Sequence, residues 1–304
     1  MAIYDAIIIG SGTSGITAAI HLSLRRWKTL VIDKDPAKGY VAGMGHVDEL
    51  LMWPGQTHGK TVIDSWHQRL KEAGGENVGA EAISLTVTSP FVVSGTAGER
   101  YESKAVIIAT GAALRSHAIE GEQKLFGRGV YHDVDMHGPF VRDHNVIVVG
   151  KSQHAVEAAL KLTKYTIRIS LIVPSVKLDA PETMIKALEA KGITPQYSTS
   201  IKRINGDDRV TSVAVLSAGV EKEIPTDGVF TLLHDYHLTT AFWKSHVECT
   251  DSGAIKVDDT LSTSIKGIFA CGDVLCGKPQ FPLISAAQGQ LVGIQVDKFL
   301  NAVS

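Results

Sequence analysis

Short apolar runs that end at glycine, aspartate or proline recur along the chain and alternate with helical patterns. The runs lie at 6–10, 29–33, 105–111, 145–150, 169–174 and 267–273. Between several of them, segments such as 15–26 and 154–164 repeat apolar positions at the spacing of a helix face. Strands buried in a parallel sheet are near-continuous apolar runs of this kind. The pattern therefore predicts an α/β fold with parallel sheets covered by helices on both faces.

The sequence of strand, glycine turn and helix occurs twice, first near residue 6 and again near residue 146. Two doubly wound, Rossmann-like dinucleotide-binding domains are predicted, and 304 residues are enough for two cores. The last apolar run, at 267–273, and the helical pattern after it must join a sheet, and we assign them to the sheet of the first domain. The second domain is therefore predicted to be inserted in the first.

The domain boundaries follow from this insertion. We place the first domain at 1–115 and 246–304, and the second at 116–245. Within the first domain, the alternating segment 84–100 predicts a small antiparallel excursion from the parallel sheet.

The charges and the N-terminal segment argue against two classes of partner. The chain has 30 Lys and Arg side chains against 32 Asp and Glu, a net charge of −2, which indicates no basic surface for nucleic acid. The first apolar run is far shorter than the roughly 20 residues that cross a bilayer, and no basic region precedes it. We expect a cytoplasmic protein whose partners are neither nucleic acid nor membrane.

The strongest local motif is G-x-G-x-x-G at 10–15, directly after the first strand. Gly10 allows a tight turn, Gly12 lets a pyrophosphate approach the backbone, and Gly15 allows close packing of helix and strand. Thr13 and Ser14 lie within the same turn. The next strand ends at Asp33, followed by Lys34, where a carboxylate that binds a ribose is expected. The motif and its context predict a dinucleotide site rather than a turn without a ligand.

Two further segments indicate which dinucleotide is bound. Ala109-Thr110-Gly111 and Gly272-Asp273 resemble the "ATG" and "Gly-Asp" segments of flavoproteins with two dinucleotide-binding domains. In that family the first domain holds FAD, and the aspartate of Gly-Asp binds its ribityl chain. The resemblance implies FAD as the cofactor, with Thr110, Gly111, Gly272 and Asp273 among its contacts.

Finer matches resemble the low-molecular-weight thioredoxin reductases over nearly the whole chain. Residues 127–162 are similar to the joint between their two domains, and Trp53-Pro54-Gly55 is similar to a turn beside their flavin. Phe281 lies within Gln280-Phe281-Pro282, where the family has a flavin-contacting "RQA". The resemblance implies a homodimer and a flavin whose pyrimidine end is held differently.

The chain departs from that family at its two defining motifs. Where the family has C-x-x-C-D, this chain has Asp133-Val134-Asp135-Met136-His137, so a dithiol is absent there. Where its second domain has G-x-G-x-x-A, this chain places Ser152 at the middle glycine, which obstructs a pyrophosphate. The next strand leads into 173–178 with a single lysine, a poor substitute for an arginine pair around a 2′-phosphate. We therefore expect an electron donor other than NADPH, such as ferredoxin or a second flavin.

Only three cysteines occur in the chain, and two of them, Cys271 and Cys276, flank Gly272-Asp273. A straight strand would hold their Cα atoms roughly 16 Å apart, so a disulfide requires a bend, which Gly272 could supply. A thiolate near the start of the following helix would be stabilised and could exchange electrons with a flavin. The alternative is that Cys271 is a buried strand residue and Cys276 an ordinary loop thiol.

The loss of C-x-x-C beside a second cysteine pair is similar to the diflavin-linked disulfide oxidoreductases, a branch in which a second FAD replaces the pyridine nucleotide. The function predicted is an FAD-dependent oxidoreductase that passes electrons between flavin and a Cys271–Cys276 disulfide, with a protein or small disulfide or dithiol as partner. Two alternatives stay open. One is a flavin oxidoreductase or oxidase acting on a small molecule without cysteine chemistry, and the other is a non-catalytic flavin-binding module.

Two histidine-rich segments have simpler explanations. His132 to His137 could ligate a metal, but solvated polar residues at a domain joint explain the pattern better, so no metal is predicted. His137 could also relay protons. His234, Tyr236 and His237 replace an apolar-Gly-x-x-Pro segment of the family, and they are either surface residues or the lining of an altered site.

Overall fold

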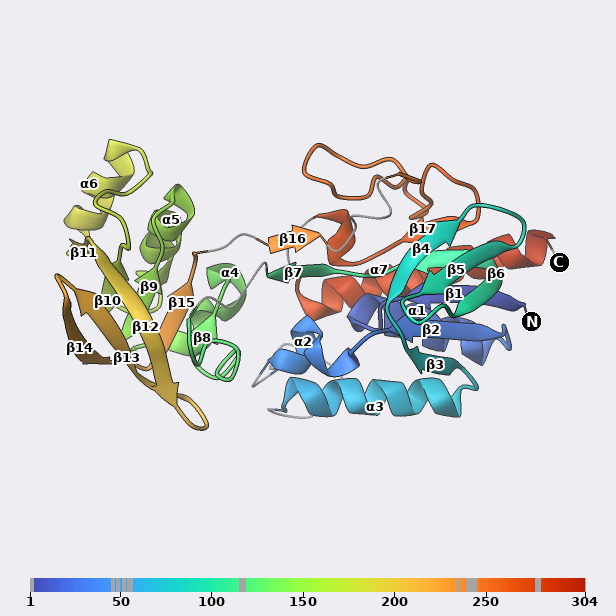
Figure 1. Ribbon diagram of the computed structural model, residues 1–304, viewed down its shortest axis with the longest axis horizontal. Helices are drawn as coiled ribbons and strands as arrows, with labels where there is room; N and C mark the ends of the chain where they lie inside the picture. The colour runs from blue at the N-terminus through green and yellow to red at the C-terminus, as the bar shows by residue number, and fades with distance from the viewer. Residues whose placement is uncertain are drawn as a thin grey trace. The chain divides into compact units, whose positions relative to one another are not determined.

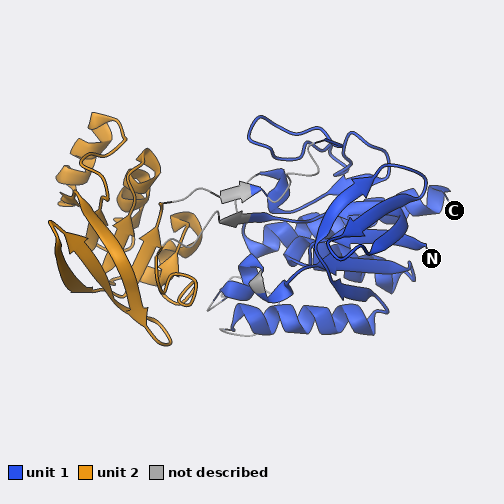
Figure 2. Cartoon of the chain, in the orientation of Figure 1, with its two compact units in different colours: residues 1–113, 236–304 blue, residues 114–235 orange. Residues whose placement is uncertain are grey.

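The computed structural model describes residues 3–44, 47, 50, 53, 57–114, 119–233, 236–238, 245–276 and 280–303. It divides into two compact units, residues 1–113 with 236–304 and residues 114–235 (Figure 2). The α/β fold with two Rossmann-type units is the fold class that the pattern predicts. Among the described residues, no helix is long and apolar enough to span a membrane.

Unit 1 is built on one seven-stranded sheet in the order β3-β2-β1-β6-β5-β4, with β17 also paired to β6 (Figure 1). The first three strands, β6 and β17 are parallel, while β4 and β5 form an antiparallel excursion. The strands are β1 Tyr4–Ile9, β2 Thr29–Asp33, β3 Glu76–Gly79, β4 Ala82–Thr86, β5 Phe91–Gly95, β6 Arg100–Ile108 and β17 Ile268–Ala270. The helices are η1 Pro36–Lys38, α2 Tyr40–Gly43, α1 Thr13–Leu24, α3 Gly59–Glu72, η3 Asp273–Leu275 and α7 Pro282–Val303.

Alternation along β1 divides the core of unit 1 into two layers. Ala6 and Ile8 pack with residues of α1 and α7 on one face of the sheet. Ile7 and Ile9 point to the other face, where β4, β5 and residues of the 247–257 segment cover them. Helices thus cover one face only, whereas the pattern predicts them on both. The strand pair formed by β4 and β5 occupies the place of the second helical layer.

Unit 2 repeats this plan on a smaller scale. Its parallel sheet has the order β11-β10-β9-β15-β8, and a separate three-stranded antiparallel sheet packs over one face. The strands are β8 Val130–Tyr131, β9 Val146–Val149, β10 Ile169–Ile172, β11 Pro195–Gln196, β12 Thr199–Gly206, β13 Val210–Ser217, β14 Val220–Pro225 and β15 Gly228–Thr231. The helices are α4 Val134–His137, η2 Gly138–Val141, α5 Gln153–Leu162 and α6 Glu182–Ala190. The short strands β7 Ala112–Leu114 and β16 Tyr236–Leu238 pair at the boundary of the units.

Candidate functional site

The turn between β1 and α1 passes so close to the end of β6 that two of its glycines have no room for a side chain. At Gly10, φ is +102° and a Cβ would lie 2.3 Å from the carbonyl oxygen of Ala109. At Gly15, a Cβ would lie 2.0 Å from the carbonyl oxygen of Gly10. The first turn of α1 is thereby held at the carboxyl edge of the sheet, where its backbone N–H groups face outward.

Gly12 has a different reason to be glycine. It is the N-cap of α1, with φ −61° and ψ 179°, a conformation open to any residue. A Cβ here would meet no atom of the chain within 4 Å. Neither strain nor packing within the protein requires glycine, so the space beside it is available to a group from outside. A pyrophosphate on the helix N-terminus is the group that this turn can accept.

Asp33, at the end of β2, is fixed beside this turn. Its Oδ2 accepts hydrogen bonds from the backbone N of Ser11 at 2.7 Å and from Ser11 Oγ at 2.8 Å. Its Oδ1 accepts one bond, from Asp35 N at 2.9 Å, and so retains a lone pair for a ribose hydroxyl. Lys34 is placed in an exposed ion pair with Glu81 at 2.8 Å.

The end of β17 meets the start of α1 at Gly272. Its φ is +84°, and a Cβ there would lie 2.4 Å from Ser14 Oγ. Ser14 Oγ donates to the carbonyl oxygen of Cys271 at 3.5 Å, and Gly272 N donates to Oε1 of Gln288 at 2.8 Å. Gly272 is therefore held between α1 and α7, and it directs the chain into η3.

Asp273 is the first residue of η3 and lies in an environment that disfavours its charge. Its Oδ1 accepts hydrogen bonds from Gln280 N at 3.0 Å and from Ser285 Oγ at 3.4 Å. Burial is the largest influence and raises the pKa of its carboxyl to about 6, while these hydrogen bonds oppose the shift. A partly desolvated carboxylate at this edge suits a polyol chain, whose hydroxyls can donate to it.

The other predicted contacts surround the same edge of unit 1. Thr110 and Gly111 follow β6, and Gly111 has φ +72°. Thr13 is buried in the first turn of α1, and its carbonyl accepts from Thr17 Oγ1 at 2.7 Å.

Trp53 and Phe281 are placed by different segments. Trp53 packs against a cluster that includes residues of α2 and α3, whereas Pro54 and Gly55 lie outside the described residues. The carbonyl of Phe281 accepts from Ile284 N at 2.9 Å, which begins α7.

The two predicted redox cysteines lie in contrasting environments. Cys271 is fully buried in the layer between the sheet and the helices α1 and α7. Burial raises the pKa of its thiol to about 12, so it is a neutral thiol at physiological pH. Cys276 is exposed at the end of η3, where its Sγ lies 3.7 Å from the carbonyl oxygen of Asp273. Of these two thiols, Cys276 is the one exposed to solvent.

Unit 2 contains a copy of the turn in unit 1. Gly10 N donates to Ile32 O at 2.9 Å, and Gly150 N makes the matching bond to Ile172 O at 3.1 Å. Ala109 N donates to Ile9 O at 2.8 Å, and Leu232 N makes the matching bond to Val149 O at the same distance. The strand registers Ile9 with Ile32 and Val149 with Ile172 confirm the correspondence.

This correspondence identifies three changed positions at the edge of unit 2. Ser152 is the N-cap of α5, with φ −88° and ψ 166°, and matches Gly12. The buried Val173 matches Asp33, and Leu233 matches Thr110. Unit 2 thus has a serine side chain at the position of Gly12 and an aliphatic side chain at the position of Asp33. The backbone of the turn is the same in both units, whereas these side chains differ.

The segment that matches the family's C-x-x-C-D forms the short helix α4. Asp133 caps it by accepting from Met136 N at 3.0 Å, and Met136 is buried. His137 is 1% exposed, stacks on Tyr131 with ring centroids 5.0 Å apart, and has Nδ1 at 2.9 Å from Asp133 O. Burial lowers its pKa to about 4, so the ring is neutral at physiological pH. His137 is therefore a buried, neutral ring, and its role as a proton relay stays a prediction.

Two further predictions concern the histidine-rich segments. Within the part of the chain that the structure describes, no group of three or more His, Cys, Asp or Glu side chains is placed to hold a metal ion. His234 lies outside the described residues, as do the side chains of Tyr236 and His237, although their backbone belongs to β16.

Three polar residues that support the site are not among those predicted from the sequence. Ser11 donates to Asp33, Ser285 donates to Asp273, and Gln288 accepts from Gly272 N. A signal existed for Ser285 and Gln288, because they are polar residues near the start of a largely apolar helix that follows Gly-Asp.

Comparisons with known proteins agree with this geometry. The family described as pyridine nucleotide-disulphide oxidoreductase matches residues 4–290. A thioredoxin reductase from Aquifex aeolicus is 31% identical over 306 residues, which is 98% of this chain and 94% of the relative. One from Listeria innocua is 30% identical, again over 98% and 94%. The crystal structure of thioredoxin reductase from Streptococcus pyogenes superimposes with a TM-score of 0.90 at 26% identity and covers 99% of both chains.

The raised pKa of Asp273 predicts how the Asp273→Asn variant changes stability in the flavin-free protein. The folded wild type binds this proton more tightly than the unfolded chain, so its free energy of unfolding decreases as pH rises from about 4 to about 6. Asparagine is always neutral and avoids the loss. Urea unfolding should show the variant gaining up to about 3 kcal/mol over wild type between pH 4 and pH 7. A difference that does not change with pH would contradict the raised pKa.

Proposed function

Because the chain belongs to the pyridine nucleotide-disulphide oxidoreductase family, we propose that it is an FAD-dependent, thioredoxin reductase-like oxidoreductase acting on a disulfide or dithiol. The observation that carries the FAD site is the open space beside Gly12, where a Cβ would meet no atom of the chain. FAD, when bound, supplies two electrons to a disulfide or takes two from a dithiol.

Residues of unit 1 would hold the parts of FAD along the carboxyl edge of the sheet. The turn at 10–15 would receive the pyrophosphate, Asp33 the adenosine ribose, and Asp273 the ribityl chain. Thr110, Gly111, Trp53 and Phe281 are proposed around the flavin end. Each carboxylate is held by hydrogen bonds from the chain itself, which would orient it toward the cofactor.

The electron route that we propose uses Cys276 and Cys271. The exposed thiolate of Cys276 attacks one sulfur of the substrate disulfide and forms a mixed disulfide, releasing the other sulfur as a thiolate. Cys271 then displaces the substrate, leaving a Cys271–Cys276 disulfide and a substrate dithiol. Because Cys271 is fully buried, this second exchange requires a rearrangement of η3. The similar proteins from Aquifex aeolicus and Listeria innocua are thioredoxin reductases, so thioredoxin is a candidate substrate.

One observation favours a second candidate function. The burial of Cys271 and its pKa of about 12 make it a poor nucleophile as the structure stands. A flavin oxidoreductase that acts on a small molecule without cysteine chemistry would need no rearrangement. The FAD site is the same in both proposals, and only the fate of the electrons differs.

The electron donor is proposed to be something other than directly bound NADPH. The groups that unit 2 presents at the positions of Gly12 and Asp33 are Ser152 and Val173. Ferredoxin or a second FAD in or near unit 2 are the donors that we consider, although a second FAD would need contacts different from those in unit 1. A homodimer, implied by the resemblance to thioredoxin reductases, is part of the same proposal.

The FAD site is tested by Gly12→Ser, which copies the serine of unit 2 into unit 1. Serine is a favourable N-cap residue, and its Cβ would meet no atom of the chain within 4 Å. In the absence of flavin, the variant and the wild type should therefore have the same midpoint of urea unfolding. Crowding of the pyrophosphate should weaken FAD binding about tenfold or more in a fluorescence titration. Wild-type affinity in the variant would show that the cofactor does not approach this turn.

The cysteine route is tested by counting electrons in an anaerobic dithionite titration of oxidised, flavin-loaded protein. Wild type should take up two electrons for the flavin and two more for the disulfide, whereas Cys276→Ser should take up only those for the flavin. Cys249→Ser is the matched control, because that thiol is remote in sequence from the pair, and it should behave as wild type. Uptake of two electrons by wild type would exclude the dithiol and leave the second candidate.

We expect NADPH to reduce the flavin slowly, at a rate that does not saturate with NADPH concentration. The reason is that the Ser152 side chain obstructs the approach of a pyrophosphate to the backbone of the turn. Anaerobic stopped-flow absorbance measures the rate, with dithionite as the control for a reducible flavin. Ser152→Gly should increase the rate by reopening the turn. Rapid, saturable reduction of wild type by NADPH would refute this part of the proposal.

A further inference from the structure

Helix α7 begins beside the proposed flavin site and lies directly against α1. At its start, Ser285 and Gln288 contact Asp273 and Gly272. One residue further, Gly289 lies so close to α1 that a Cβ would be 2.2 Å from the carbonyl oxygen of Ser14. The groups that support Asp273 therefore depend on where α7 lies along α1.

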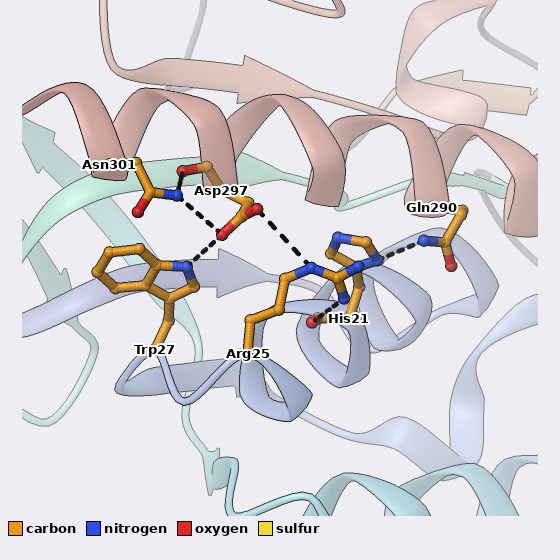
Figure 3. Close-up of polar contacts among 6 residues, drawn as sticks. All are labelled: His21, Arg25, Trp27, Gln290, Asp297 and Asn301. Carbon is orange, nitrogen blue, oxygen red and sulfur yellow. Dashed lines mark hydrogen bonds and ion pairs between the residues drawn. The ribbon is translucent and has the colours of Figure 1, made fainter.

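Further along, away from the proposed flavin site, polar contacts join α7 to α1 and to the segment directly after α1 (Figure 3). The ring of His21 is 5% exposed and lies against Gly293, where a Cβ would be 3.0 Å from it. The side-chain amide of Gln290 contacts Nδ1 of His21. This contact is the first of two polar attachments between the helices.

The second attachment centres on Asp297. Its Oδ1 accepts a hydrogen bond from Trp27 Nε1 at 2.7 Å, and its Oδ2 lies 3.7 Å from Nε of Arg25. Asn301, one turn on, donates to the carbonyl and Oδ1 of Asp297, as Figure 3 shows. Arg25 also donates to the carbonyl of His21 at 3.1 Å. We call His21, Trp27, Gln290 and Asp297 the α7 clamp.

The α7 clamp fixes the position of α7 along α1, which the apolar contacts between the helices do not. Burial of apolar surface is non-directional and tolerates small sliding or rotation of one helix on another. The Trp27 to Asp297 hydrogen bond is directional and fixes one register. Asp297 lies nine residues beyond Gln288, a rise of about 13.5 Å along the helix, so a shift at the clamp is transmitted to the flavin end.

We propose that the α7 clamp is a positioning device for the flavin site, although none of its residues touches the cofactor. By fixing α7 against α1, it holds Gln288 and Ser285 where they support Gly272 and Asp273. The inference rests on the proposed FAD site in unit 1. It assigns a role in cofactor binding to residues that the FAD motifs do not include.

The test is the FAD affinity of Trp27→Phe, which removes the indole N–H and keeps an aromatic ring. Loss of the bond should raise the FAD dissociation constant about threefold to tenfold. The visible circular dichroism of bound FAD should change as well, because its support at Asp273 shifts. Tyr4→Phe is the matched control, because it also removes a single hydrogen-bond donor from an aromatic side chain. Tyr4 Oη donates to Glu76 at 2.8 Å, at the end of β1 that is opposite to Gly10. It should leave affinity and spectrum as in wild type.

Substitutions at Asp297 keep the test decisive if Trp27→Phe does not fold. Asp297→Asn retains an oxygen for Trp27 Nε1 and should bind FAD nearly as wild type does, whereas Asp297→Ala should resemble Trp27→Phe. Variants that lose stability but keep wild-type FAD affinity and spectrum would overturn the inference alone. A wild type that binds no FAD would overturn the proposed function and this inference together.

Discussion

The absence of room for a Cβ at Gly10 and Gly15 is the constraint on which the rest of unit 1 depends. A Cβ at Gly10 would lie 2.3 Å from a backbone carbonyl oxygen, and one at Gly15 would lie 2.0 Å from another. Backbone oxygens cannot move aside as a flexible side chain could. Because these glycines let β1, α1 and the end of β6 meet, the N-terminus of α1 lies at the carboxyl edge of the sheet. Asp33 reaches this edge at the end of β2 and Asp273 in η3, after β17, so both carboxylates lie at the edge where α1 begins.

The two units show that this backbone arrangement persists when its ligand groups change. Gly150 repeats the hydrogen bonds of Gly10, and Ser152 has nearly the backbone conformation of Gly12. What differs is the side chains that face the edge, with serine, valine and leucine in place of glycine, aspartate and threonine. The fold is set by strand register and packing, whereas binding is set by a few positions that packing does not constrain. One chain can therefore keep two Rossmann units with the same turn, while we propose a dinucleotide site of the usual kind in unit 1 alone.

Much of the fold could be predicted from the sequence because the apolar runs and glycine turns act locally. The runs at 6–10 and 145–150 contain the buried strands β1 and β9, and each strand is followed by a turn and a helix, as expected. The second layer of unit 1 could not be predicted, since β4 and β5 cover Ile7 and Ile9 only through long-range pairing. The same holds for the site. Gly12 and Asp33 carry a local motif, but the burial of Cys271 depends on α1 and α7, which lie near opposite ends of the chain. Ser285 and Gln288 follow Asp273 closely in sequence, yet their contacts depend on how α7 packs against α1.

The central claim is that unit 1 holds FAD and unit 2 does not hold a dinucleotide in the same way. The most direct measurement is to identify and count the flavin released when purified wild-type protein is denatured, relative to the protein concentration. We expect FAD, at one molecule per chain, or at two if the electron donor is a second FAD in or near unit 2. A chain purified after supplementation with FAD that releases no flavin would contradict it.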